Sequence, residues 1–115
     1  MGQQARISKN NTKVEQLGEY RVVTLHGTPV VKVHSSGTVT LTSGGWRTAT
    51  TKARINQVAN EWGLGFRVHQ DNYRWHVSLI DQQTGRLHKP RGFLDGMTFN
   101  PEIEALYIGG VALAW

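Results

Sequence analysis

The stretch that decides the fold is a hairpin pattern at residues 66–80, which read FRVHQDNYRWHVSLI. Apolar and polar side chains alternate on both sides of Asp71-Asn72, a dipeptide that favours a two-residue turn. Such a turn pairs residue 69 with residue 74 and residue 66 with residue 77. The core face then carries Phe66, Val68, Trp75 and Val77, and the opposite face carries Arg67, His69, Arg74 and His76. A slip of one residue would bury the charged side chains, so the pattern fixes which face is buried.

The segment before this hairpin predicts a meander and a helix. Residues 20–42 hold three runs of β-forming residues separated by turns, which predicts three antiparallel strands. Apolar side chains then recur at helical spacing at Ile55, Val58, Ala59 and Trp62. This stripe predicts a helix over residues 50–62, with a threonine as N-cap and Gly63 at its end. We expect Trp46 and Trp62 to be core residues.

Both ends of the chain have a distinct character. Residues 1–18 lack apolar periodicity and predict a flexible polar arm ahead of a single domain over residues 19–115. Near the other end, Asn100-Pro101 resembles a helix start and Gly109-Gly110 a helix stop. We expect a short C-terminal helix there. The apolar tail 111–115 must dock on the body of the protein or on a second copy, giving a homo-oligomer.

These elements together predict an α+β fold. Its antiparallel sheet of about five strands comes from the β-meander and the β-hairpin, with one long helix between them and a short C-terminal helix.

Composition narrows the class of protein. The 115 residues contain no cysteine, which excludes disulfides, zinc–thiolate sites and thiol nucleophiles. No segment is long and apolar enough to span a membrane, so we expect a cytoplasmic protein without a membrane partner. The net charge is +5, and residues 21–91 hold ten Lys or Arg against three acidic residues. Charge gathered in this way suits an anionic partner, although solubility explains it equally well.

Two groups of residues are candidates for contacting an anion. The first is the polar face of the hairpin, Arg67, His69, Arg74 and His76, which suits phosphate or carboxylate; an ordinary solvated sheet face explains the same pattern. The second is the helix and its approach, where Arg47, Lys52, Arg54 and Asn56 are side-chain types that contact phosphates and base edges. The same types also fill ordinary helix surfaces. Tyr73, beside the hairpin turn, is the best candidate for stacking on a base.

Enzyme motifs are absent from the sequence. There is no nucleophile elbow, metalloprotease motif, phosphate-binding loop or dinucleotide fingerprint, so we expect neither catalytic residues nor a cofactor. The five histidines show no metal-ligand spacing. An ion shared by His69 and His76 would lack a third ligand, so we expect no metal site.

Two stretches carry a resemblance to known proteins. Residues 25–31 (LHGTPVV) and 39–57 (VTLTSGGWRTATTKARINQ) resemble small uncharacterised accessory proteins encoded by tailed bacteriophages, with the likeness covering about residues 20–80. The resemblance implies a phage accessory protein acting in the bacterial host cytoplasm. It brings no catalytic residues with it.

We therefore expect a non-enzymatic basic protein that binds nucleic acid, DNA or RNA, mainly through the phosphate backbone. The alternative is a protein-interaction module or inhibitor that engages an acidic surface of a host protein.

Overall fold

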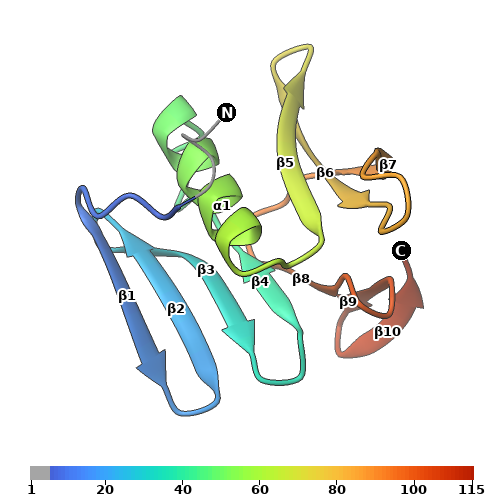
Figure 1. Ribbon diagram of the computed structural model, residues 1–115, viewed down its shortest axis with the longest axis horizontal. Coiled ribbons are helices and arrows are strands. Elements are labelled where there is room, and N and C mark those ends of the chain that lie inside the picture. Colours follow the sequence, from blue (N-terminus) through green and yellow to red (C-terminus); the bar gives the residue numbers. More distant parts are fainter. Residues whose placement is uncertain (1–5) are drawn as a thin grey trace.

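Ten strands and one helix form within residues 6–115, the part of the chain that the computed structural model describes (Figure 1). Seven strands make one antiparallel sheet in the order β1-β2-β3-β4-β8-β9-β10. Their bounds are Thr12–Leu17, Tyr20–Leu25, Thr28–His34, Val39–Leu41, Met97–Asn100, Ala105–Ile108 and Val111–Ala114. A second, three-stranded sheet contains β5 (Phe66–Asp71), β6 (Arg74–Ile80) and β7 (Leu87–Gly92). The helix α1 spans Ala49–Glu61.

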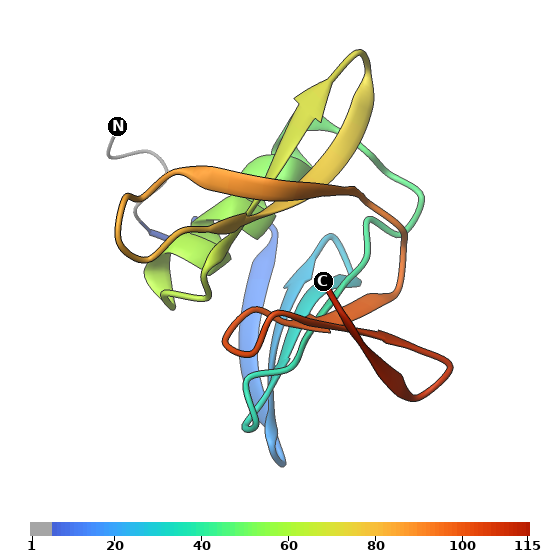
Figure 2. The same ribbon diagram turned by 90° about the vertical axis from the view of Figure 1, so that its right-hand side faces the viewer.

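The helix and the three-stranded sheet are an insertion between two neighbouring strands. β4 pairs directly with β8, Leu41 opposite Met97, although more than fifty residues separate them along the chain. Residues 42–96, which we call the insertion, leave the seven-stranded sheet after β4 and return to it at β8. Figure 2 shows β5, β6 and β7 packed above that sheet, with α1 beside them.

The two ends of the insertion are tied together by Asp95. Its carboxylate accepts hydrogen bonds from the Ser43 backbone N–H at 2.6 Å and from the Ser43 hydroxyl at 2.7 Å. Gly96 N–H donates to the Leu41 carbonyl at 2.7 Å beside them. Burial raises the pKa of Asp95, but the bonds from Ser43, the charge of Arg47 and the bond from Thr42 together lower it by more, so that the pKa lies below its ordinary value. The neck of the insertion is thus closed by an ionised carboxylate.

One apolar core joins both sheets and the helix. Valines and leucines of β2, β3 and β4 meet Ile55 and Val58 of α1 and Phe66 and Val68 of β5. The ring of Phe66 packs edge-on against Phe99 of β8, with centroids 5.2 Å apart. Because the two sheets share no backbone hydrogen bonds, this packing and α1 hold the insertion in place.

The helix is fixed to the outer edge of β5 by Asn56. Its side-chain amide donates to the Val68 carbonyl, and its carbonyl oxygen accepts from the Val68 N–H, both at 2.8 Å. β5 has β6 on one side only, so Asn56 satisfies backbone groups that no strand reaches. The helix begins at the N-cap Thr48, whose hydroxyl accepts from the Thr51 N–H at 3.1 Å. These bounds agree with the helix expected over residues 50–62.

The fold class predicted from the sequence is wrong. The structure is mostly β, with ten strands rather than about five, and the described residues contain no C-terminal helix. Asn100 accepts the Glu102 N–H as a helix start would, but the chain reverses at Glu104, where φ is +50°. Gly109 and Gly110 then take φ of +57° and +80° and form the two-residue turn between β9 and β10. The apolar run interpreted as a helix is therefore a hairpin.

The N-terminal segment contributes another strand. Part of the expected polar arm is β1, whose residues Thr12–Leu17 pair along their whole length with β2. Residues 1–5 of that expected arm lie outside the described residues. β1 reads as polar because it is an edge strand with exposed side chains, so its sequence lacks an apolar face.

The register of the β5–β6 hairpin differs from the prediction by two residues. His69 lies opposite His76 and Asp71 opposite Arg74, so the turn is Asn72-Tyr73 rather than Asp71-Asn72. A shift of two preserves the side-chain alternation, so the buried and the polar face are the ones expected.

Replacing Asn56 by alanine tests the link between α1 and β5. The variant leaves the N–H and carbonyl of Val68 buried without a partner, and we expect a loss of about 2–4 kcal/mol in the free energy of unfolding. Asn60 is a matched control because it is the same residue type, one turn further along α1 and exposed. Asn60→Ala should change stability by less than about 0.5 kcal/mol. Urea unfolding of both variants makes the comparison, and equal midpoints would contradict the assigned role.

Candidate functional site

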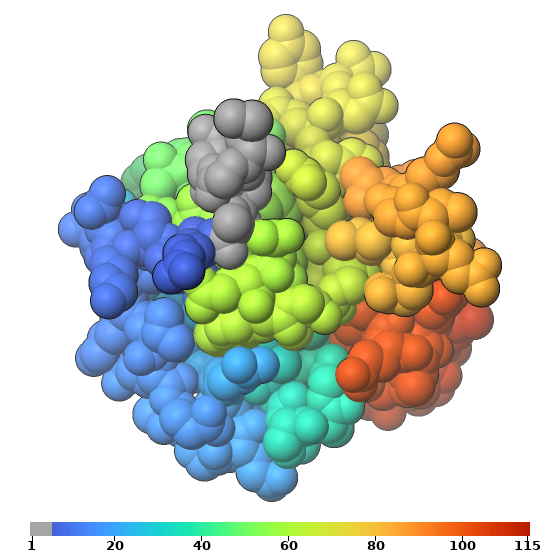
Figure 3. Space-filling view, viewed as in Figure 1, coloured from blue at the N-terminus to red at the C-terminus, as the bar shows by residue number. Residues whose placement is uncertain are grey.

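The polar side of the β5–β6 hairpin gathers four basic side chains, which we call the basic face: Arg67, His69, Arg74 and His76. Arg67 and Arg74 are exposed, and the two histidines are partly buried between them. The hairpin projects from the body of the molecule, as the yellow atoms at the top of Figure 3 show. The structure therefore brings together the four residues that the hairpin pattern predicted on one face.

The histidine pair forms the middle of the basic face. The rings of His69 and His76 stack with centroids 5.7 Å apart and an angle of 25° between their planes. His69 Nε2 also shares a hydrogen bond of 2.7 Å with the Ser78 hydroxyl. Burial lowers the pKa of His69, and the neighbouring His76, Arg67 and Lys52 lower it further, against a smaller opposite effect of Asp71. His69 is therefore mostly neutral at pH 7.

The two arginines carry the permanent charge of this face. Three ion pairs occur among residues 6–115, and they join Lys13 to Glu15, His34 to Glu19 and Lys89 to Glu104. Neither Arg67 nor Arg74 takes part in any of them. Asp71 lies opposite Arg74 in the strand register without forming an ion pair with it. Both guanidinium groups thus keep their hydrogen-bond donors for a ligand.

The residues predicted on the helix surface are placed differently. Arg54 and Asn56 are buried, with exposed fractions of 5% and 8%. Arg54 donates to the Gln57 side chain and to the Asn10 carbonyl, and Asn56 is fixed to β5. Neither side chain reaches the surface, because Asn56 faces β5 and Arg54 faces the N-terminal segment. We therefore do not include them in the candidate site.

Lys52 and Arg47 lie nearer to the basic face. Lys52 Nζ donates to the Gln70 side chain on β5 at 3.2 Å, and its charge acts on His69. The guanidinium of Arg47 lies 5.1 Å above the ring of Phe93. Phe93 in turn packs edge-on against Trp75 of β6, with centroids 5.2 Å apart. Lys52 therefore extends the basic face, whereas Arg47 covers an aromatic cluster behind it.

Tyr73 stands at the tip of the hairpin and is 93% exposed. Asn72 and Tyr73 have φ values of +53° and +64°, the left-handed region that suits asparagine and glycine far better than tyrosine. A bulky residue in that conformation costs of order 1 kcal/mol. The chain thus holds an aromatic ring in solvent at a position where glycine would be more stable.

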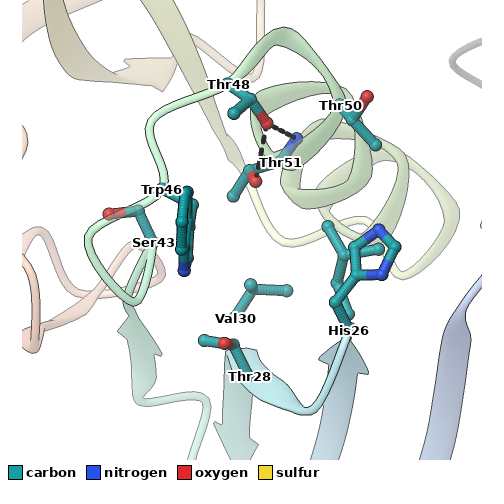
Figure 4. A pocket seen from close by; sticks show the side chains of 9 residues that line it. His26, Thr28, Val30, Ser43, Trp46, Thr48, Thr50 and Thr51 are labelled. Carbon is teal, nitrogen blue, oxygen red and sulfur yellow. Dashed lines mark hydrogen bonds between the residues drawn. The ribbon is translucent and has the colours of Figure 1, made fainter.

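Sequence reasoning missed a second feature, a cavity beside Trp46. Trp46 was expected in the core, but 70% of it is exposed. It lines a cavity of 530 Å³, which we call the indole pocket, between the loop 43–48, the β2–β3 turn and the first turn of α1 (Figure 4). Gly44 and Gly45, with φ of +63° and +83°, bend the loop so that the indole faces outward. This pair of glycines before a tryptophan is the signal that points to a loop instead of a core position.

Two further features were searched for in residues 6–115, a metal site and a membrane-spanning helix. Nowhere in residues 6–115 do three His, Asp or Glu side chains gather closely enough to hold a metal ion. In the same part of the chain, no helix is long and apolar enough to cross a membrane.

Comparison with known proteins gives the family. The family model described as Kyanoviridae Gp96 protein matches residues 1–100, so the chain belongs to this phage protein family. The match confirms the resemblance to phage proteins stated from the sequence. No curated protein and no solved structure matches the chain.

The lowered pKa of His69 predicts a pH dependence of stability. The ordinary pKa of a histidine is 6.5, and that of His69 in the folded protein is lower. When the pH falls below 6.5, the unfolded chain therefore binds a proton at this residue more readily than the folded protein does. Protonation therefore favours unfolding, and stability falls as the pH drops through this range. Urea unfolding at pH 7.5 and pH 5.5 should show that His69→Gln loses less stability on acidification than the wild type. Equal losses in the two proteins would contradict the assignment.

Proposed function

We propose that this member of the Kyanoviridae Gp96 family is a non-enzymatic nucleic-acid-binding protein that holds the phosphate backbone on its basic face, in the cytoplasm of the infected bacterium. The observation that carries the proposal is the pair of exposed arginines, Arg67 and Arg74, which lack ion pairs and flank two stacked histidines on a projecting hairpin.

Arginine suits this role because its planar guanidinium binds phosphate oxygens through two parallel hydrogen bonds. Arg74 lies opposite Asp71, which is four steps along β5 from Arg67, so the two arginines are about 13 Å apart along the strand direction. That span corresponds to about four base steps of a duplex. The two arginines can therefore contact different phosphates of one strand.

Several other Lys and Arg side chains contact partners within the fold. The guanidinium of Arg21 lies 4.1 Å from the Trp62 ring, and that of Arg91 lies 5.5 Å from the Trp115 ring. Lys89 bonds Glu104 at 2.7 Å. These contacts fasten the elements of the fold to one another. They leave Arg67 and Arg74 as two exposed guanidinium groups, without such partners, on one face of a projecting hairpin.

The histidine pair adapts the basic face to an anion. Burial lowers the pKa of His69, and a phosphate close to the ring would oppose that effect by favouring the imidazolium. A neutral His69 in the free protein also avoids like-charge repulsion with Arg67 and Arg74. The face is thus stable when empty and gains charge when a phosphate binds.

A second candidate is a protein-interaction module that meets an acidic host protein. The observation that favours it is the C-terminal hairpin, whose strand β10 is exposed throughout and forms a free edge of the seven-stranded sheet. Ile108, Val111 and Leu113 there are each close to half exposed or more. Exposed apolar side chains on a free edge are typical of a surface that pairs with another chain.

Salt dependence tests the leading proposal. We expect the affinity for a single-stranded oligonucleotide to fall log-linearly with salt, because bound phosphates release counterions. Arg67→Ala together with Arg74→Ala should weaken binding at 50 mM salt and reduce the slope of log affinity against log salt by about 1.4, or 0.7 per lost phosphate contact. Fluorescence anisotropy with a labelled oligonucleotide measures both quantities.

The matched control removes the same charge from elsewhere. Lys9 and Lys32 are exposed and lie outside the insertion, so Lys9→Ala with Lys32→Ala should leave the slope nearly unchanged. Equal effects of the two double variants would show that net charge, and not the basic face, governs binding. If the wild type binds no oligonucleotide at 50 mM salt, nucleic-acid binding is excluded and the protein-interaction candidate is favoured.

Tyr73→Gly separates stability from binding. Glycine adopts the observed φ without strain, so the free energy of unfolding should stay equal or rise by up to about 1 kcal/mol. Affinity for a single strand should fall at least about fivefold, because a base loses its stacking partner. Thermal unfolding and anisotropy measure the two effects. A variant that is less stable yet binds as tightly as the wild type would contradict the stacking role.

A further inference from the structure

The indole pocket has a shape that suits a flat ring. Trp46 forms one wall and His26 the opposite wall, with the plane of the indole turned toward His26 across the cavity (Figure 4). Leu25 and Val30, exposed by 3% and 1%, make an aliphatic floor. The volume of 530 Å³ lies within the range of about 300–1,000 Å³ that is usual for small-molecule sites.

The loop that carries Trp46 is preorganised by hydrogen bonds in the free protein. The backbone N–H of Trp46 donates to the Ser43 carbonyl at 3.0 Å, and the backbone N–H of Gly45 donates to the Ser43 hydroxyl at 3.2 Å. Ser43 is itself 1% exposed and held by Asp95. A Cβ on Gly44 would lie 2.7 Å from the Thr28 methyl group, so this loop packs tightly on the β2–β3 turn. The backbone that carries the indole is thus fixed in the free protein, which lowers the entropy cost of binding.

The lining also decides the chemical character of the ligand. No Lys, Arg, Asp or Glu lines the cavity, so an ionised group has no counter-charge inside it. Thr28 lines it, and its hydroxyl makes no hydrogen bond to another described residue. Thr48 and Thr51 line it as well, and their hydroxyls bond each other at 3.0 Å. A hydroxyl both donates and accepts, so these side chains can meet the polar edge of a neutral heterocycle.

We infer that the indole pocket binds a nucleobase, which lies flat against Trp46 with its polar edge toward the threonine hydroxyls. The inference rests on the proposed function in one respect, since a bound strand is one source of such a base; a free nucleotide is the other. Phosphates remain outside the pocket in both cases, because its lining carries no permanent charge. Every base can stack on an aromatic ring, so the pocket should discriminate only weakly among bases. It should discriminate strongly against a sugar phosphate that has no base.

The test follows the indole N–H signal of Trp46 by NMR in the full-length protein. The signals of Trp62, Trp75 and Trp115 are internal controls. Adenosine and cytidine monophosphates should shift the Trp46 signal, and ribose 5-phosphate, the same phosphate without a base, should leave it in place. A short oligonucleotide and its abasic counterpart form the second pair of probes.

The variants are Trp46→Ala and Trp46→Phe, with Ile103→Ala as matched control because Ile103 is an exposed apolar residue outside the pocket, 64% accessible. Affinity for the base-bearing probe should fall at least about fivefold in Trp46→Ala, be partly retained in Trp46→Phe and stay unchanged in the control.

Each outcome has one meaning. A shift with the monophosphates supports the pocket and identifies a free nucleotide as sufficient. A shift with the base-bearing oligonucleotide alone supports it with a strand as the source. If Trp46 responds to none of the base-bearing probes, or equally to probes with and without a base, the inference is overturned. If the protein does not bind a strand in a salt-dependent way but the monophosphates still shift the Trp46 signal, the proposed function is contradicted and the pocket inference is supported.

Discussion

The carboxylate of Asp95 closes the neck on which the rest of the molecule depends. Its bonds to the Ser43 N–H and hydroxyl, at 2.6 and 2.7 Å, join the two points where the insertion leaves and rejoins the seven-stranded sheet. The two sheets are not joined by a backbone ladder, so the chain departs in a direction set by bonds at the neck. Besides those of Asp95 with Ser43, these run from the Gly96 N–H to the Leu41 carbonyl, from the Thr42 N–H to the Val30 carbonyl and from the Thr42 hydroxyl to Asp95. Ser43 then orients the loop that carries Trp46 and leads into α1. One hydrogen-bonded carboxylate thus helps to position both the helix and the indole pocket.

This architecture divides the chain into the seven-stranded sheet and the insertion, which carries both candidate sites. The insertion, residues 42–96, holds eight of the thirteen Lys and Arg residues but four of the eight acidic ones. Its charge is therefore +4, against +1 for all other residues. The insertion also holds the basic face, Tyr73 and Trp46. The basic middle of the sequence is thus a structural unit, and the sheet formed by the flanking segments supports it.

How much of this was predictable depends on the range of the interactions involved. The helix from Ala49 to Glu61 follows from a local apolar stripe, and the basic face follows from strand alternation, which a two-residue slip of register leaves intact. Interactions between distant residues were invisible. From the sequence alone, Asn56 and Arg54 were assigned to the exposed surface of the helix. In the structure, β5 covers Asn56, and the segment around Asn10 covers Arg54. The C-terminal hairpin was mistaken for a helix because Asn100-Pro101 and Gly109-Gly110 suit both structures, and pairing with β8 decides between them.

The most direct measurement follows the side-chain Nε–H signals of Arg67 and Arg74 by NMR as a single-stranded oligonucleotide is added at low salt. If the basic face binds the phosphate backbone, these two signals should shift first, together with backbone signals of β5 and β6, and should return as salt is raised. Shifts that leave both arginines unmoved, or that scatter evenly over the seven-stranded sheet, would contradict it.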